Sequence, residues 1–83
     1  MTYKRTVIKD TILGDGTRLE LVEAGRGGHF MVVHNDDARR RYVTLYGSSN
    51  RRLAKAYFDG CLTMPPGKLA NAADRVLSQQ APR

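Results

Sequence analysis

The sequence predicts an α+β fold, in which a four-stranded antiparallel sheet is followed by two helices packed on one of its faces (ββββαα). In the first half of the 83-residue chain, short apolar stretches with a period of two are separated by turn residues. After Gly47 the apolar residues recur at helical spacing instead. Strands and helices do not alternate, which disfavours a parallel sheet. The length fits one domain, residues 1–83.

The first two strands are predicted at about residues 3–13 and 17–23. The first is rich in Thr, Val, Ile and Tyr and ends at Gly14-Asp15-Gly16, where the Asp-Gly pair supplies the positive φ angles of a tight hairpin turn. In the second, Leu19 and Leu21 share one face, the pattern of a half-buried strand. A tight turn between them predicts that the two strands pair.

The third and fourth strands are predicted at about residues 29–34 and 40–46. The loop 25–28, Gly-Arg-Gly-Gly, precedes the third strand, and its apolar run over residues 30–33 is typical of a central strand. Asn35-Asp36-Asp37 is expected to turn the chain. The fourth strand alternates apolar residues with Tyr and Thr, so both of its faces have side chains that can pack.

Two helices are predicted at about residues 50–59 and 66–79. We expect Ser48 or Ser49 as the N-cap of the first and Gly60 as its left-handed C-cap, with Cys61 just beyond the cap packing on the helix in a Schellman motif. Pro66 suits the first turn of the second helix. We expect these residues to form the helical side of the core: Leu53, Tyr57, Leu69, Ala73, Val76 and Leu77. Leu19, Leu21 and residues 30–33 are expected to face them.

Composition narrows the class of protein and its partners. Hydrophobic residues make up 41% of the chain and charged residues 27%, which is not the composition of a disordered protein. Fourteen Lys and Arg against 8 Asp and Glu give a formal net charge of +6 and a pI near 10.0. This balance predicts a polyanion or an acidic protein surface as the partner.

The cysteine content and the N-terminal sequence predict a cytoplasmic protein with no membrane partner. A single cysteine, Cys61, allows no intramolecular disulfide and no cysteine zinc cluster. Charged residues interrupt the N-terminal segment, so neither a signal peptide nor a membrane span is expected.

The predicted binding site is a cluster of positive charge. Between Asp37 and Asp59 there are six cations and no acidic residue, so the whole net charge is concentrated in this segment. Two tyrosines among the cations could stack on bases. The binding residues are predicted to be Arg39, Arg40, Arg41, Tyr42, Tyr46, Arg51, Arg52 and Lys55. The alternative is a solvated basic surface with ordinary core tyrosines.

No catalytic, cofactor or metal site is expected, and we predict that the protein is not an enzyme. The loop at residues 25–28 lacks the ending of a phosphate-binding loop. His29 and His34 are five residues apart, which places them on opposite faces of a strand. The segment from His34 to Asp37 has no second ligand cluster, and no Ser, His and Asp arrangement suggests a catalytic triad.

The second half of the chain resembles compact phage anti-CRISPR proteins that inhibit the type I-F surveillance complex (Cascade). The likeness begins near Arg41 and includes the Ser-rich cap, the sequence Tyr57-Phe58-Asp59-Gly60-Cys61-Leu62, the Pro-Gly connection and the short amphipathic helix. It implies a non-enzymatic phage or mobile-element protein that binds the CRISPR complex and blocks recognition of target DNA. The strongly basic composition departs from acidic inhibitors that mimic DNA, and no functional residue is carried over from the family.

Residues 28–62 also resemble the three-stranded DNA-binding arm domains of phage integrases, whose sheet enters the major groove. That likeness implies a small DNA- or RNA-binding module whose strand residues read the bases. An inhibitor of a CRISPR effector complex is therefore our first expectation and a nucleic-acid-binding module our second. A structural or interaction subunit is a third. The chain is expected to act as a monomer or small homo-oligomer.

Overall fold

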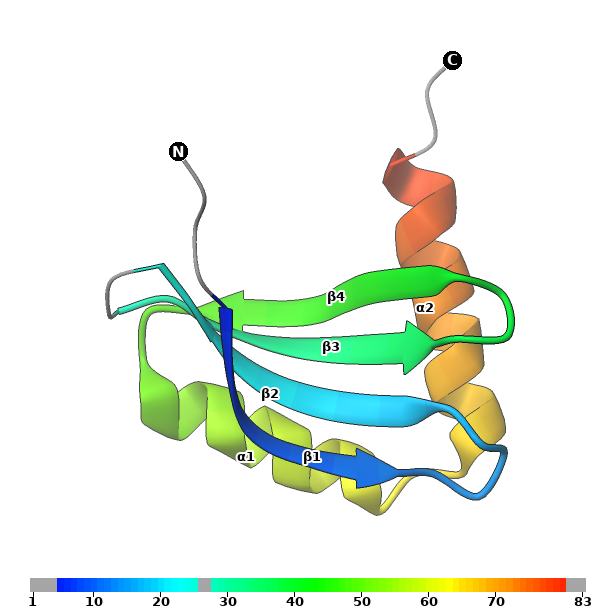
Figure 1. The fold of residues 1–83 in the computed structure, drawn as a ribbon, viewed down its shortest axis with the longest axis horizontal. Coiled ribbons are helices and arrows are strands. Elements are labelled where there is room, and N and C mark those ends of the chain that lie inside the picture. The colour runs from blue at the N-terminus through cyan, green and yellow to red at the C-terminus, as the bar shows by residue number, and fades with distance from the viewer. Residues whose placement is uncertain (1–4, 26–27, 81–83) are drawn as a thin grey trace.

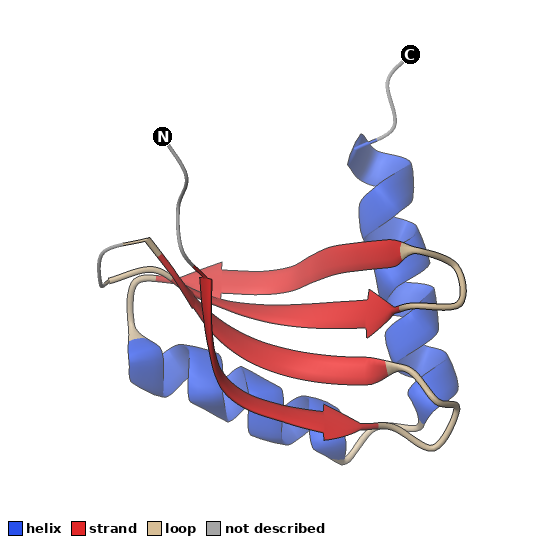
Figure 2. Ribbon diagram, viewed as in Figure 1, coloured by secondary structure: helices blue, strands red, loops and turns tan. Residues whose placement is uncertain are grey.

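A computed structural model describes residues 5–25 and 28–80 and confirms the predicted α+β order. The strands are β1 (Arg5–Ile12), β2 (Arg18–Ala24), β3 (Phe30–Asp36) and β4 (Arg41–Ser48), and the helices are α1 (Arg51–Leu62) and α2 (Pro66–Gln80). The strands pair antiparallel in the order β1-β2-β3-β4. Both helices lie behind this sheet in the view of Figures 1 and 2, on what we call its back face.

Two features predicted from sequence fall partly outside the described residues. These are the start of the first strand at residue 3 and the middle of the loop at residues 25–28. Within the described part of the chain, no helix has the length and apolarity that a membrane span requires.

The β1–β2 turn forms where predicted, with one difference in its backbone. The Leu13 amide donates to the Thr17 carbonyl at 2.7 Å, and Gly16 has a φ of 87°. Asp15 does not have a positive φ, although both residues of an Asp-Gly pair often do in a hairpin turn. Instead its carboxylate accepts hydrogen bonds from the Thr17 amide at 3.0 Å and the Thr17 hydroxyl at 2.6 Å. This side-chain turn replaces the second left-handed residue.

The third and fourth strands extend further than predicted. Asn35 and Asp36, expected in a turn, pair with Tyr42 and Arg41 in the ladder. The chain reverses over residues 37–40, where Arg40 takes a φ of 53°. This left-handed residue tightens the turn, so the ladder can continue to its edge. At its other end, β4 runs on through Gly47 and Ser48.

Two β-bulges curl the sheet toward its front face. The ladder register shifts between Val7 and Lys9 in β1, and between Val32 and Val33 opposite β4, which leaves Ile8 and Leu45 as the extra residues. Across the front face, the Arg5 guanidinium lies 4.4 Å from the centre of the Tyr42 ring. Edge strands of a flat four-stranded sheet would be about 14 Å apart. The curl of the sheet and the long side chains of Arg5 and Tyr42 cover the middle of the front face. Val22 and Val33 are therefore fully buried, although neither helix lies on that face.

The main core lies between the back face and the helices. It consists of a cluster of buried side chains from β2, β3, α1 and α2: Leu19, Leu21, Phe30, Val32, Ala54, Phe58, Cys61 and Leu69. Ile8, Leu13, Leu45 and Tyr46 pack against the cluster and are partly buried. The expected contributions of Leu19, Leu21 and Leu69 are therefore confirmed, and Ala73 is also buried.

The predicted core face of α1 is wrong. Leu53 is 52% exposed and Tyr57 is 38% exposed, whereas Ala54, Phe58 and Cys61 face the sheet. Both sets have helical spacing, so periodicity alone does not separate them. Burying Phe58 costs no hydrogen bond, whereas a buried Tyr57 hydroxyl would need a partner. On α2, Leu77 is also exposed and Val76 is partly buried, so they add less to the core than predicted.

Both predicted caps of α1 are wrong as well. Asn50 is the N-cap, and its side chain accepts hydrogen bonds from the backbone amides of Arg52 and Leu53. Gly60 lies inside the helix, which ends at Leu62 with Thr63 as the C-cap. The Thr63 hydroxyl donates to the Gly60 carbonyl at 2.7 Å. Continuing the helix buries Cys61, so no Schellman motif forms there.

Leu69→Ala should lower the free energy of unfolding by about 2–5 kcal/mol, because Leu69 is 1% exposed and its removal leaves a cavity between α2 and the sheet. Denaturant unfolding measures the change. Leu77→Ala on the same helix is the matched control and should cost clearly less, because Leu77 is 36% exposed. Equal losses would contradict the docking of α2 through Leu69.

Candidate binding surface

The structure separates the six cations among the predicted binding residues into two groups at opposite ends of β4. Arg39, Arg40 and Arg41 lie at the β3–β4 turn, whereas Arg51, Arg52 and Lys55 lie on α1, beyond the other end of the strand. The eight residues of β4 span roughly 25 Å. The six cations are therefore contiguous in sequence but do not form one surface.

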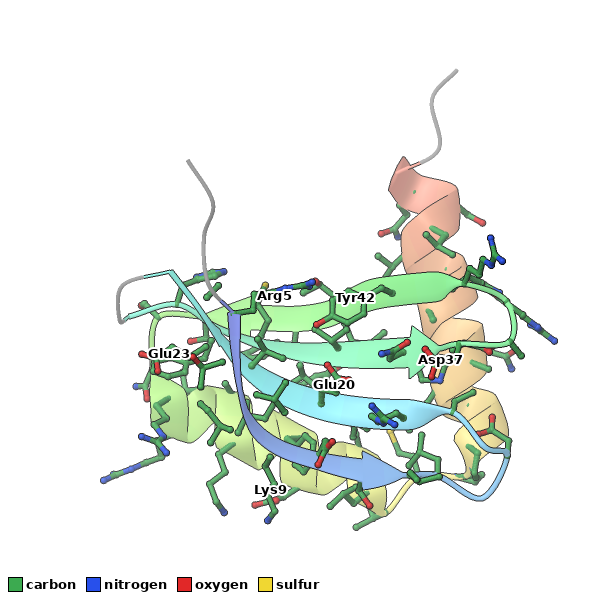
Figure 3. The ribbon with its side chains drawn as sticks, viewed as in Figure 1. Arg5, Lys9, Glu20, Glu23, Asp37 and Tyr42 are labelled. Atoms are coloured by element: carbon green, nitrogen blue, oxygen red, sulfur yellow. The ribbon has the colours of Figure 1, made fainter. Side chains whose placement is uncertain are left out.

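At the β3–β4 turn the cations lie among carboxylates. Arg39 pairs with Asp36 at 3.8 Å, and Arg41 forms an ion pair with Asp74 of α2. The hydrogen bond from Arg41 lowers the pKa of Asp74. Asp37 lies at the same end of the sheet (Figure 3). Much of the positive charge at this end is therefore compensated locally.

At the start of α1, two exposed arginines are not compensated in this way. Arg51 and Arg52 occupy the first helical turn, which contains no acidic residue, and neither forms an ion pair with any other described residue. Glu23 lies at the same end of the sheet (Figure 3) and forms no ion pair with them. Lys55 is bound to Asp59 at 2.9 Å, and this hydrogen bond lowers the pKa of Asp59.

Tyr42 lies on the front face and its ring is occupied by other side chains. Arg5 covers the ring, and the hydroxyl donates to Oε1 of Glu20 at 3.2 Å (Figure 3). Burial raises the pKa of Tyr42, and the neighbouring Glu20 carboxylate raises it further. The buried Glu20 also accepts a hydrogen bond from Asn35 at 3.2 Å and lies 3.9 Å from Arg18. This network joins β1 to β4 and leaves Tyr42 poorly placed to stack on a base.

Tyr46 lies on the back face, opposite to Tyr42. Its ring stacks on Tyr57 of α1, with the ring centres 4.5 Å apart and the planes 7° from parallel. The sequence predicts Leu53 and Tyr57 in the core, so their exposure on the surface is a feature that sequence reasoning missed. The residue that indicates this arrangement is Phe58. A helix that buries Phe58 against the sheet turns Leu53 and Tyr57 outward.

His34 belongs to a hydrogen-bonded chain beneath the β1–β2 turn. The Thr17 hydroxyl donates to Asp15, so the His34 Nε2, 3.1 Å from that hydroxyl, acts as a donor to it. Hydrogen bonds from the Thr17 hydroxyl and the Thr17 amide lower the pKa of Asp15. Because His34 is 2% exposed, this chain braces the turn and presents no exposed imidazole.

A hollow of about 400 Å³ is lined by Met64, Lys68, Asn71, Ala72 and Arg75, which include no acid, histidine or cysteine. In the part of the chain that the structure describes, no three His, Cys, Asp or Glu side chains group as metal ligands. Burial raises the pKa of the Cys61 thiol, which disfavours its reactive thiolate.

Folding stability should fall as the pH drops below about 6.5, because burial lowers the pKa of His34. The unfolded chain takes up this proton at a higher pH than the folded chain does. The stability that the neutral His34 contributes is therefore fully present above the pKa that His34 has in the unfolded chain. It is lost as the pH falls toward the lower pKa that His34 has in the folded chain. The slope is at most about 1.4 kcal/mol per pH unit. Denaturant unfolding between about pH 7.5 and pH 5.5 measures it.

His34→Gln should flatten this pH profile, whereas the same change at the exposed His29 should leave it in place. A profile of the unaltered protein that is already flat, or one that survives His34→Gln, would contradict the assignment to His34.

Comparisons of the chain with protein-family models, with curated proteins and with solved structures found no match.

Proposed function

We propose that this protein is a non-catalytic binding protein that engages an acidic protein surface through the start of α1. The observation that supports this most directly is the pair Arg51 and Arg52. Both are exposed, both lie in a first helical turn without an acid, and neither has an ion-pair partner among the described residues.

The position of these arginines is unfavourable for folding. The N-terminal end of a helix has a partial positive charge, so a cation there costs about 0.3–1 kcal/mol where an acid would stabilise. The first turn of α1 has two such cations. Their charge adds to that of the helix end and concentrates positive potential at one place. An anionic partner offsets this cost on binding, so the arrangement favours a binding role.

A protein partner suits the charge distribution better than a nucleic acid. Proteins bind duplex DNA through several phosphate contacts, made by cations that cluster on one face or along one stripe. Here the six cations of the predicted cluster are divided between two ends of β4, and three of them pair with carboxylates. Exposed Leu53 and Tyr57 beside the arginines are also typical of a protein interface.

For the identity of the target we propose a type I CRISPR surveillance complex, following the resemblance of the second half of the chain to phage anti-CRISPR proteins. Such an inhibitor acts by occupying its target and needs no catalytic site.

A nucleic-acid-binding module is the second candidate, because Arg5, Arg18 and Tyr42 lie on the sheet face without helices. An integrase-like arm would place this face in the major groove. Two features disfavour it here. The Glu20 carboxylate lies at the centre of the face, and Arg5 and Glu20 occupy the Tyr42 ring and hydroxyl.

The variant Arg51→Glu/Arg52→Glu should bind a purified type I-F surveillance complex at least about tenfold more weakly than the parent, measured by biolayer interferometry at physiological salt. The same change should raise the free energy of unfolding by about 1 kcal/mol, because acids replace cations in the first helical turn and position 51 gains Lys55 as an i,i+4 partner. Opposite effects on binding and stability exclude unfolding as the cause of lost binding.

Lys68→Glu/Arg75→Glu is the charge-matched control, since it makes the same change at two exposed positions of α2. It should keep most of the affinity. Equal losses in both variants would show that net charge alone drives association. Failure of the parent to bind the complex would refute the proposed target. Tight binding of the parent to duplex DNA alone would support the second candidate.

A further inference from the structure

An exposed apolar surface adjoins the two arginines on α1. Leu53 and Tyr57 are one helical turn apart on the same side of the helix and are 52% and 38% exposed. Tyr57 stacks on Tyr46 of β4, so the surface continues from the helix onto the sheet. We call Leu53, Tyr57 and Tyr46 the tyrosine patch.

The tyrosine patch is held in place before any partner binds. The stacked rings fix the Tyr57 side chain against β4, and Tyr46 itself packs against the buried core. A partner would therefore meet apolar surface that needs little ordering on binding. Within the described residues, neither tyrosine hydroxyl has a hydrogen-bond partner. Both remain available as donors at the edge of an apolar surface.

One basic side chain lies beside this patch on the same helix. Arg52 directly precedes Leu53 and lies about 100° around the helix from it. Arg51 lies about 160° from Leu53, on the side of Lys55, which is already paired with Asp59. Apolar contact, hydroxyl donors and the unpaired Arg52 guanidinium therefore lie close together on α1, and Arg51 adds positive charge at the same end of the helix.

From this combination we infer that the tyrosine patch docks a segment of a partner protein in which an apolar or aromatic anchor is flanked by carboxylates. The anchor would contact Leu53 and Tyr57, and the carboxylates would accept hydrogen bonds from Arg52 and the tyrosine hydroxyl groups, with Arg51 adding electrostatic attraction from the helix end. This inference rests on the proposed function and specifies the chemistry of the partner.

Charge selects this occupant over a second copy of the chain. Two copies each have a net charge of +6, so a symmetric interface through the patch would bring together two surfaces of like charge. No carboxylate of α1 is free to pair with the arginines of a second copy, because the one acid of that helix, Asp59, is bound to Lys55. An acidic segment meets the same surface with complementary charge.

The test is a selection of random 12-residue peptides, displayed on phage, for binding to the full protein. The enriched peptides should combine an aromatic or large aliphatic residue with at least two acids. Representative synthetic peptides are then titrated against the parent and three variants by fluorescence anisotropy. Leu53→Gln should weaken binding at least fivefold and leave its salt dependence unchanged, because it removes apolar contact and no charge.

Leu62→Gln is the matched control. Leu62 is on the same helix, 42% exposed, and about 180° around the axis from Leu53, so this variant should bind like the parent. Arg51→Glu/Arg52→Glu should weaken binding and flatten the salt dependence. Circular dichroism melting of each variant checks that it is folded.

The outcomes separate this inference from the proposed function. If Arg51→Glu/Arg52→Glu loses affinity and Leu53→Gln does not, the patch is not the docking surface, although the basic end of α1 still binds. If both keep full affinity, both proposals fail. Three other outcomes would each overturn an acidic peptide as the occupant. The enriched peptides could contain no acids, or duplex DNA could bind tightly in a way that Leu53→Gln abolishes. Light scattering could also show a dimer that Leu53→Gln dissociates.

Discussion

The rotation of α1 on the sheet determines what this protein shows to its surroundings. The helix packs against Leu19, Leu21 and Val32 through Ala54, Phe58 and Cys61. Phe58 fixes that contact because it is the largest fully buried side chain. Once Phe58 points inward, Tyr57 must point toward β4 and Leu53 must face solvent. A helix rotated by a single residue position would bury the tyrosine and leave no patch. The chemistry of the surface is therefore a consequence of the core.

The strand order, the helices and most of the sheet core follow from periodicity and turn residues, which is why the sequence predicts them. The errors occur where two choices satisfy the same pattern. On α1, helical spacing fits two possible core faces, one formed by Leu53 and Tyr57 and the other by Ala54 and Phe58. The second face is the buried one because it places no hydroxyl group in the core. Asn50 competes with Ser48 and Ser49 as a cap, and the geometry of the chain leaving β4 decides between them.

The candidate site is less accessible to sequence reasoning, because charge density along a chain is not charge density in space. A strand between two groups of cations separates them by its whole length, and carboxylates distant in sequence, such as Asp74 beside Arg41, compensate one of the groups. The contact of Arg5 with Tyr42 joins opposite edges of the sheet and depends on its curl. Local spacing contains no information about either relationship.

The two bulges have a further consequence for how the chain behaves in a crowded solution. Ile8 and Leu45 both interrupt edge strands, the only strands of this sheet with one unpaired side. An uninterrupted edge would offer a regular row of amide and carbonyl groups to any extended chain nearby. Here each row is broken near its middle, and Lys9 adds a charge beside the break in β1. The irregularity that curls the sheet thus also disfavours its growth into an aggregate.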